Sequence, residues 1–253
     1  MPRLSIFLLA VFALSAVPSF AGEAPATPDN PITKSIEVLV SADARYMPDR
    51  KNAMSALAQN PEAAAGPMLN ALEKNSDAQA RLWLLLCINS FEDMSVFRSD
   101  SGKIVALLKD ENFGTKYWAI KTVARMKLPS AMAPLAELLN GNDYLLRAAA
   151  ATAVGVIGGP AAPVDKLIEL LGDENMIVRS SAAESLGELK DAKAKKPLIA
   201  VLEKEDESLV VKRCAVIALE GITSSSFGIE PQDWTAGSNA IENDIKTWIA
   251  ANR

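Results

Sequence analysis

The stretch VRSSAAESLGEL, residues 178–189, decides the fold, because similar segments recur along the chain. Its second residue is basic, and small and apolar residues follow. Five other segments align with it, and their basic residues follow one another at intervals of 31, 35, 31, 32 and 33 residues. The six basic positions are Arg50, Arg81, Lys116, Arg147, Arg179 and Lys212. A period of this length indicates one structural unit used about six times.

The residues after each basic position define one face of a helix. Offsets of three, four and seven are apolar in all six segments, and these offsets lie on one side of an α-helix. A second amphipathic segment follows in five of the units, at residues 65–74, 102–110, 133–139, 162–171 and 195–204. Two antiparallel helices of this size cannot bury both faces alone. We therefore expect an all-α solenoid in which the units stack on one another.

The unit LLGDENMIVRSSAAESLGELKDAKAKKPLIAVL, residues 170–202, resembles a bacterial HEAT repeat of the short kind associated with phycobilin-lyase subunits. The resemblance covers roughly residues 45–222. It implies a right-handed α-α superhelix, a HEAT-like solenoid of about six two-helix repeats. We expect this solenoid over residues 31–226, with residues 31–42 covering the first unit, and a C-terminal loop and capping helix over residues 227–253.

The HEAT resemblance also implies a role for the basic residues. In this family the basic side chain pairs with the turn aspartate of a neighbouring unit and sets the register between repeats. Asp110, Asp173 and Asp206 stand six residues before a basic position and fit that role. A guanidinium offers a rigid fork to a carboxylate, so we expect Lys116 and Lys212 to pair more loosely. We interpret all these residues as structural, since such ion pairs need no ligand to explain them.

The start of the chain has the pattern of a secretory signal peptide. Arg3 precedes an apolar stretch at residues 6–17, and small residues follow it. This stretch is well short of the ~20 residues that span a bilayer. We therefore expect a signal peptide at residues 1–21, a flexible linker at residues 22–30, and an exported protein that is periplasmic or secreted, with no membrane span after cleavage.

The charge balance excludes one class of partner. Removal of residues 1–21 takes away Arg3 as their only charge, so the net charge moves from −5 to −6. The remaining chain has no concentrated basic stripe. It is therefore a poor candidate for binding nucleic acid or anionic membranes.

The residue types present argue against a catalytic, cofactor-binding or metal site. The sequence contains no histidine, which removes histidine triads, histidine-containing zinc sites and imidazole proton transfer. Cys87 and Cys214 lie four units apart, or roughly 30–40 Å at the usual spacing of packed helices, too far for an intramolecular disulfide. We expect the column of Cys214 to face outward, which leaves a reactive thiol or an intermolecular disulfide open there.

Two tryptophans mark the strongest candidate binding surface. Trp83 and Trp118 stand two positions after a basic residue, nearly opposite the core face of the helix. We expect them side by side on neighbouring outer helices, joined by Tyr117. Exposed paired tryptophans favour a contact surface. The alternative is that the insertion at residues 89–100 folds over them.

We expect an exported, non-enzymatic scaffold that binds a protein partner of unknown identity. Binding would use either the concave row of second helices or the tryptophan patch. Two alternatives stay open: an enzyme or enzyme subunit of the lyase type, and a structural component of an envelope assembly. The lack of histidine argues against the enzyme.

Overall fold

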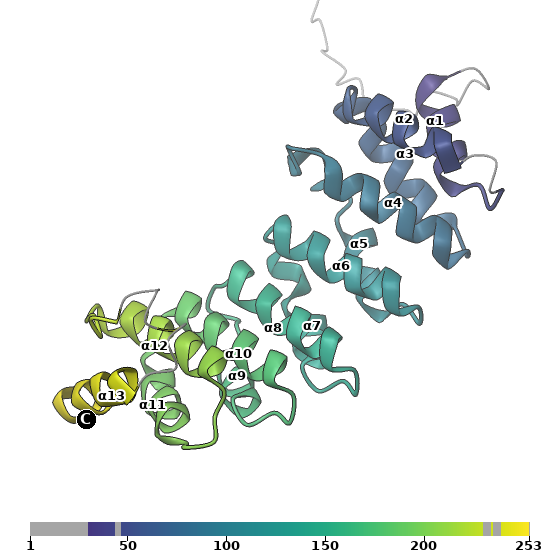
Figure 1. Cartoon of the computed structure of the whole chain (residues 1–253). Helices are drawn as coiled ribbons and strands as arrows, with labels where there is room; N and C mark the ends of the chain where they lie inside the picture. The colour runs from purple at the N-terminus through teal and green to yellow at the C-terminus, as the bar shows by residue number, and fades with distance from the viewer. Residues whose placement is uncertain (1–29, 44–46, 230–233, 235–238, 253) are drawn as a thin grey trace, which may run out of the picture.

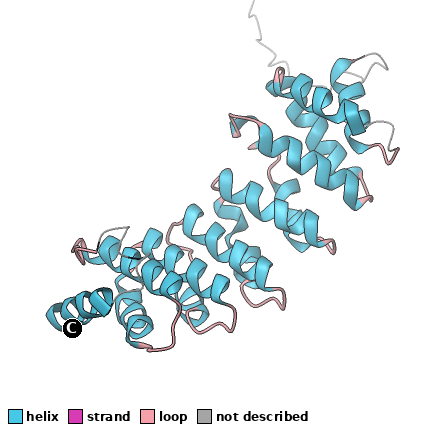
Figure 2. Cartoon of the chain, viewed as in Figure 1, coloured by secondary structure: helices cyan, strands magenta, loops and turns pink. Residues whose placement is uncertain are grey.

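The computed structural model describes residues 30–43, 47–229, 234 and 239–252. The expected signal peptide, and all of the expected linker except Asn30, lie outside the described residues. Within the described part every regular element is a helix and no strand occurs (Figure 2). The all-α prediction is therefore confirmed.

The helices form two rows. The first row holds the helices that carry the repeated basic residues: α2 (Met47–Ala58), α4 (Ala78–Ser90), α6 (Phe113–Arg125), α8 (Tyr144–Ile157), α10 (Met176–Leu189) and α12 (Leu209–Thr223). The second row holds their shorter partners: α3 (Pro61–Lys74), α5 (Gly102–Ala106), α7 (Met132–Leu138), α9 (Val164–Leu170) and α11 (Lys195–Glu203). From α4 to α12, each first-row helix packs on the next, and the units follow one another in an elongated array (Figure 1). The structure thus confirms a solenoid of two-helix units.

The apolar face of each first-row helix fills the space between the rows. Ala182, Ala183 and Leu186, at the three apolar offsets after Arg179, are fully buried. The buried side chains form one connected core that runs from Ile32 to Ile249. A continuous core of this kind is what stacking adds to units that are too small to fold alone.

Small residues bring α8, α10 and α12 unusually close together. A methyl group on Gly155 would lie 2.8 Å from the Cα atom of Ser185, and one on Gly187 would lie 2.7 Å from the Cα atom of Ala218. The Ser185 hydroxyl donates a hydrogen bond to the carbonyl oxygen of Ala151 at 2.8 Å, across the same contact. These three helices therefore pack backbone against backbone, which any larger side chain would prevent.

Each end of the array is closed by a further helix. At the N-terminal end, α1 (Pro31–Val40) contacts both helices of the first unit, as expected, and also α4. At the other end, α13 (Asn239–Asn252) lies beside α11 and α12 (Figure 1). Ile245 and Trp248 of α13 are buried, and the Trp248 ring stacks on Phe227 with 3.9 Å between centroids.

The close packing of α10 on α12 gives a direct test. We expect Gly187→Ala to lower the free energy of unfolding by about 1–3 kcal/mol, because the added methyl group forces the helices apart. Gly66→Ala is the matched control, since Gly66 lies inside α3 with open space around it. That change should raise stability by up to ~1 kcal/mol through helix propensity. Urea unfolding followed by circular dichroism measures both, and equal effects of the two changes would contradict the packing argument.

Candidate interaction surface

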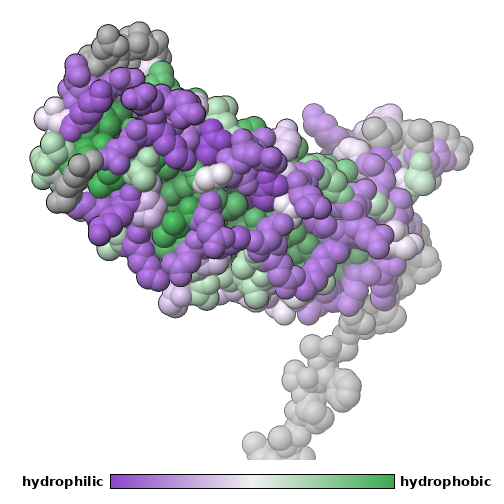
Figure 3. All heavy atoms as spheres, turned by 90° about the horizontal axis from the view of Figure 1, so that it is seen from below, coloured by the Kyte–Doolittle hydropathy of each residue, from purple (hydrophilic) through white to green (hydrophobic). Residues whose placement is uncertain are grey.

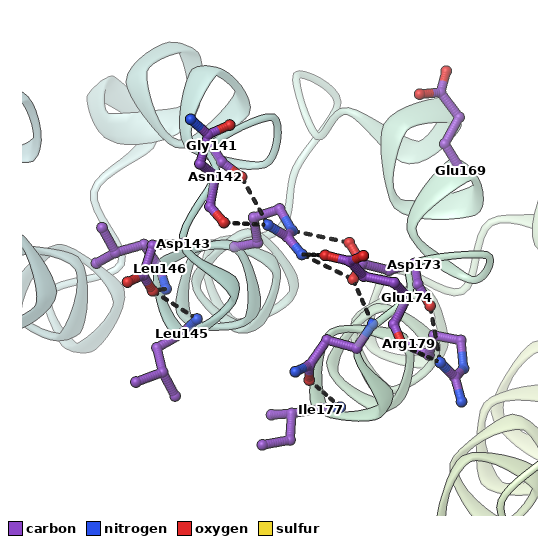
Figure 4. A network of polar contacts seen from close by, with 12 residues as sticks. Gly141, Asn142, Asp143, Leu145, Leu146, Glu169, Asp173, Glu174, Ile177 and Arg179 are labelled. Atoms are coloured by element: carbon purple, nitrogen blue, oxygen red, sulfur yellow. Dashed lines mark hydrogen bonds and ion pairs between the residues drawn. The ribbon is translucent and has the colours of Figure 1, made fainter.

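Buried or half-buried arginines clamp consecutive turns together along one edge of the array. Arg147 shows the full arrangement: its Nε and Nη2 atoms donate to the two carboxylate oxygens of Asp173, each at 2.9 Å (Figure 4). Its Nη1 atom donates to the carbonyl oxygens of Gly141 and Asn142, also at 2.9 Å. One side chain thus holds the turn before its own helix and the turn before the next first-row helix.

Arg81 and Arg179 make the same double contact. The Nε atom of Arg81 lies 2.9 Å from a carboxylate oxygen of Asp110, and its Nη1 atom donates to the carbonyl oxygen of Asn75 at 2.9 Å. The Nη2 atom of Arg179 lies 2.7 Å from the carboxylate of Glu207, while its Nη1 atom donates to the carbonyl oxygen of Asp173 at 2.9 Å.

The pairing expected for Asp206 is wrong. Asp206 is exposed, and the buried residue in its turn is Glu207. Glu207 lies one residue nearer the start of α12, and its longer side chain still reaches Arg179. The periodicity of the sequence identifies the turn but does not identify which of its adjacent carboxylates turns inward.

The clamp changes the pKa of its carboxylate. Burial raises the pKa of Asp173, but hydrogen bonds from Arg147 and from the backbone N–H of Asn175 outweigh it, so the pKa lies below its ordinary value of 3.8. The hydrogen bond to Asp173 also raises the pKa of Arg147. Because the folded-state pKa of Asp173 is lowered, its contribution to stability is present above about pH 3.8 and is lost as the pH falls through the folded value.

The other three basic residues differ from Arg81, Arg147 and Arg179. Arg50 is buried; its Nη2 atom donates to the carbonyl oxygen of Ser41 in the turn before its own helix, and its guanidinium lies 4.7 Å from the centroid of the Trp83 ring. Lys116 and Lys212 make no ion pair with any described residue. The place of the acidic partner for Lys116 is taken by Gly141, six residues before Arg147. Lys212 is buried at the last seam and faces a pocket of about 560 Å³ beside α13.

The tryptophans do not form the exposed pair that the sequence suggests. Trp83 and Trp118 are both half-buried, and no ring contact joins them. Arg50 stacks on Trp83. Trp118 lines a small, mainly apolar pocket of about 340 Å³ between α6 and α8. Tyr117 does contact Trp118, edge to face, with 6.1 Å between ring centroids.

The insertion after α4 packs elsewhere. Phe91, Met94 and Phe97 of this segment are buried, and its short helical turn at Ser95–Phe97 contacts α3. Its buried side chains therefore belong to the core and pack near α3, a helix of the second row.

Both cysteines are buried free thiols, so the expectation that Cys214 faces outward is wrong. Burial raises the pKa of Cys87 to about 12. Burial also raises the pKa of Cys214 to about 12, and the neighbouring Glu184, which accepts a hydrogen bond from the thiol at 3.3 Å, adds to the shift. Neither residue supplies a thiolate near neutral pH.

The cysteine and acidic residues of the described ranges form no group of three or more that could hold a metal ion. Among the helices of the described residues, none is long and apolar enough to cross a membrane.

A row of exposed apolar side chains runs along the edge where the first-row helices begin. Nine large hydrophobic residues are exposed in the described part of the chain, and all belong to α6, α8, α10 and α12. Seven of them are the first or second residue of their helix. We call these seven the apolar edge: Phe113, Tyr144, Leu145, Met176, Ile177, Leu209 and Val210.

The stacking of the helices places these residues in line. The four helices lie side by side, and each is separated from the next along the chain by one antiparallel helix, so all four begin at the same edge. Leu145 and Ile177 project on the same side of their helix starts, away from the ion pair between the turns (Figure 4). In the space-filling view from below, apolar patches follow one another along the molecule and are bordered by hydrophilic residues (Figure 3).

Each turn beside the apolar edge carries an exposed carboxylate. These acidic residues are Glu111, Asp143, Glu174 and Asp206. Asp143 also caps α8 by accepting hydrogen bonds from the backbone N–H groups of Leu145 and Leu146. An exposed carboxylate therefore stands beside the edge in each of these turns, although that of Glu174 lies 4.0 Å from the Nη2 atom of Arg147 and the exposed Arg213 stands one helical turn after Leu209.

The sequence contains a signal for this edge. The last three repeats carry two large apolar residues three and two positions before the basic residue. The first turn of a helix ordinarily favours acidic and small polar residues, and these positions lie outside the apolar face that defines the core. Their exposure becomes certain only when the neighbouring helices are in place.

The clamp predicts a large effect of one isosteric change. We expect Asp173→Asn to lower the free energy of unfolding by about 3 kcal/mol near pH 7, because it leaves Arg147 buried without its counter-charge. The difference from the unchanged protein should shrink below about pH 3.8, where Asp173 itself takes up a proton. Lys193→Ala is the control, since the Lys193–Asp165 pair is exposed and should contribute less than ~1 kcal/mol. Similar losses in both variants by urea unfolding would contradict the assignment.

The raised thiol pKa values predict slow labelling. At pH 8 we expect Cys87 and Cys214 to react with an aromatic disulfide reagent only on unfolding, because a pKa of about 12 leaves almost no thiolate. Absorbance of the released thiol measures the rate with and without urea. A Lys193→Cys variant places a thiol at an exposed position and should react within minutes. Equally fast labelling of the native cysteines would contradict the buried assignment.

Comparison with solved structures places the fold among designed and natural repeat proteins. An engineered protein is 23% identical, with a TM-score of 0.59 over 78% of this chain and 100% of that one. A designed armadillo repeat protein in complex with the peptide (KR)4 is 20% identical, with a TM-score of 0.57 over 76% and 99%. The complex of CpcE and CpcF of phycocyanin lyase from Nostoc sp. PCC7120 is 18% identical, with a TM-score of 0.50 over 93% and 99%.

A search of curated protein sequences finds no match. The family profile of HEAT repeats, in contrast, matches residues 66–155 and again residues 134–220. Together these two matches cover more than half of the 253 residues, over the units in which the clamps and the apolar edge occur. The chain belongs to the HEAT repeat family.

Proposed function

We propose that this protein is an exported, non-enzymatic HEAT-repeat scaffold that binds a protein partner along the apolar edge. The observation that carries the proposal is the recurrence of exposed apolar residues at equivalent positions of four consecutive units. Single exposed hydrophobic residues are common on protein surfaces, whereas an aligned series bordered by polar residues is typical of an interaction site.

The distribution of exposed apolar residues favours this edge over the two surfaces that the sequence suggests. None of the nine exposed large hydrophobic residues of the described part lies on the second row of helices. Trp83 is engaged by Arg50. Tyr117 stacks on Phe113 with 6.0 Å between ring centroids and also contacts Trp118, so these two aromatic residues extend the edge inward from the start of α6.

The proposals of export and of a non-enzymatic role are supported by the sequence and by the pKa of the two thiols. The first 21 residues have the pattern of a cleavable signal peptide. The chain has no histidine, and the pKa of both thiols is about 12, so neither cysteine is an activated nucleophile. A repeat array also suits a binding role, since the designed armadillo repeat protein with a similar fold was solved in complex with a peptide.

A comparison of two surface variants tests the binding surface. The edge variant carries Tyr144→Ser, Ile177→Ser and Val210→Ser. We expect this variant to bind the stoichiometric partner recovered from the exported fraction at least about a hundredfold more weakly, since each change removes roughly 1 kcal/mol of apolar contact. The control variant carries Ile217→Ser, which changes an exposed residue of α12 away from the edge. It should bind as the unchanged protein does.

Three outcomes would contradict the proposal. The first is a partner that the edge variant retains and the control variant loses. The second is turnover of a substrate by the purified chain, which would favour the lyase-type alternative. The third is a full-length N-terminus on the exported fraction, whereas cleavage after Ala21, read by mass spectrometry, is the expected result.

A further inference from the structure

Lys212 places a buried cation at the last seam of the array. Only 5% of its surface is exposed, and its ammonium group makes no ion pair with any described residue. The hydrogen bond that Lys212 donates within α12 comes from its backbone N–H and goes to the carbonyl oxygen of Ser208. An ammonium group removed from water is unfavourable unless a negative charge compensates it. A negatively charged group beside Lys212 would therefore be stabilising.

The clamped seams show which group compensates the cation at this position. Lys212 stands in its repeat where the clamping arginines stand in theirs. In those seams a carboxylate comes from the turn before the next first-row helix, as Asp173 does for Arg147 and Glu207 does for Arg179. After α12 the next described helix is α13, which does not continue the repeat (Figure 1). The described part of this seam therefore brings no carboxylate to Lys212.

A pocket of about 560 Å³ lies beside Lys212, between α11, α12 and α13. This volume is typical of small-molecule sites, which measure ~300–1,000 Å³. Part of the wall is aliphatic, since it includes Leu202 of α11 and Ile245 and Ile249 of α13, and all three are buried. One ligand in this pocket can therefore contact a buried ammonium group and aliphatic side chains at the same time.

The charges around the pocket favour a ligand with a single negative charge. Three lysines and three glutamates line it, so their charges sum to zero. All of them except Lys212 are exposed, and water screens exposed charges strongly. A single negative charge compensates the one buried cation. A second negative charge on the same group would have no buried counter-charge and would be repelled by the glutamates.

We propose that this pocket binds a small organic acid with one carboxylate and an aliphatic body, and that the carboxylate pairs with Lys212. The ligand carboxylate takes the part that Glu207 takes in the preceding seam, and the aliphatic body replaces water against Leu202, Ile245 and Ile249. The site is separate from the apolar edge, since none of the seven edge residues lines the pocket. It extends the function of the chain beyond binding a protein partner.

Isothermal titration calorimetry of the full chain with decanoate, below the micellar concentration, tests the inference. We expect a single decanoate ion to bind per chain. Decylammonium should not bind measurably, because its charge would lie against Lys212. From hexanoate to decanoate the affinity should rise by up to about fourfold for each added methylene group, since each one is removed from water. Decyl phosphate, as a dianion, should bind at least about tenfold more weakly than decanoate.

Two variants at equivalent positions of the repeat test the role of the cation. Lys212→Met keeps the bulk of the side chain and removes its charge, so decanoate should bind at least about tenfold more weakly. Lys116→Met is the matched control, because Lys116 has the same place in its repeat but does not line the pocket. Decanoate should raise the Tm of the unchanged protein and of the control, and not that of Lys212→Met. Circular dichroism checks that both variants retain their helicity.

A third variant tests the preference for one charge. Glu205→Gln with Glu242→Gln removes two of the glutamates that line the pocket. We expect it to narrow the difference in affinity between decanoate and decyl phosphate, because the repulsion of the second charge falls. An unchanged difference would contradict the role given to these glutamates.

Several results would overturn the inference. These are the absence of decanoate binding, equal binding of decylammonium, an affinity that does not depend on chain length, and unchanged binding by Lys212→Met. Tighter binding of the tripeptide Ala-Ala-Leu than of decanoate would also overturn it, since the pocket would then be a site for a peptide C-terminus. If Lys212→Met does not fold, the ligand series on the unchanged chain decides. None of these results depends on whether the apolar edge binds a protein.

Discussion

The double contact of a buried arginine with two consecutive turns organises this molecule. A guanidinium removed from water requires a counter-charge and acceptors for its remaining N–H groups. Arg147 obtains the first from Asp173 and the second from the carbonyl oxygens of its own turn. Because both sets of acceptors are held in place by helix starts, satisfying one side chain aligns two units. The alignment of the helix starts along this edge is therefore a consequence of satisfying the arginine side chains between the units.

The array is not uniform along its length. From α8 to α12 the clamps coincide with backbone-to-backbone packing at Gly155 and Gly187. Between α6 and α8 the clamp is absent, since Lys116 faces a turn with Gly141 in place of an acid, and a pocket opens beside Trp118. At both ends an additional helix takes over the role of a neighbouring unit. The register between repeats is thus fixed by the most contacts in the three units that contain α8, α10 and α12.

Much of this architecture follows from the sequence because it depends on local periodicity. Offsets of three, four and seven residues fix the buried face of each helix whatever the details of its neighbours, as Ala182, Ala183 and Leu186 illustrate. The pairs Arg81–Asp110 and Arg147–Asp173 lie between residues singled out by the repeat and by the family resemblance. Those features need only a unit that repeats.

The features that escaped prediction depend on contacts between units. Glu207 replaces Asp206 because a difference of one residue in a turn decides which carboxylate faces the seam. Cys214 is buried because α10 supplies Glu184 beside it, and Trp83 is covered because Arg50 of the preceding unit lies on its ring. Exposure is likewise a property of the assembled array: the paired apolar residues before the basic position are visible in the last three repeats, but only the neighbouring helices decide that they stay exposed. The carboxylates beside that edge have a further effect in the unoccupied protein. Two copies that approached edge to edge would bring like charges together while burying their apolar residues. Repulsion between the exposed carboxylates opposes self-association, so these residues help to keep two free copies of the chain apart.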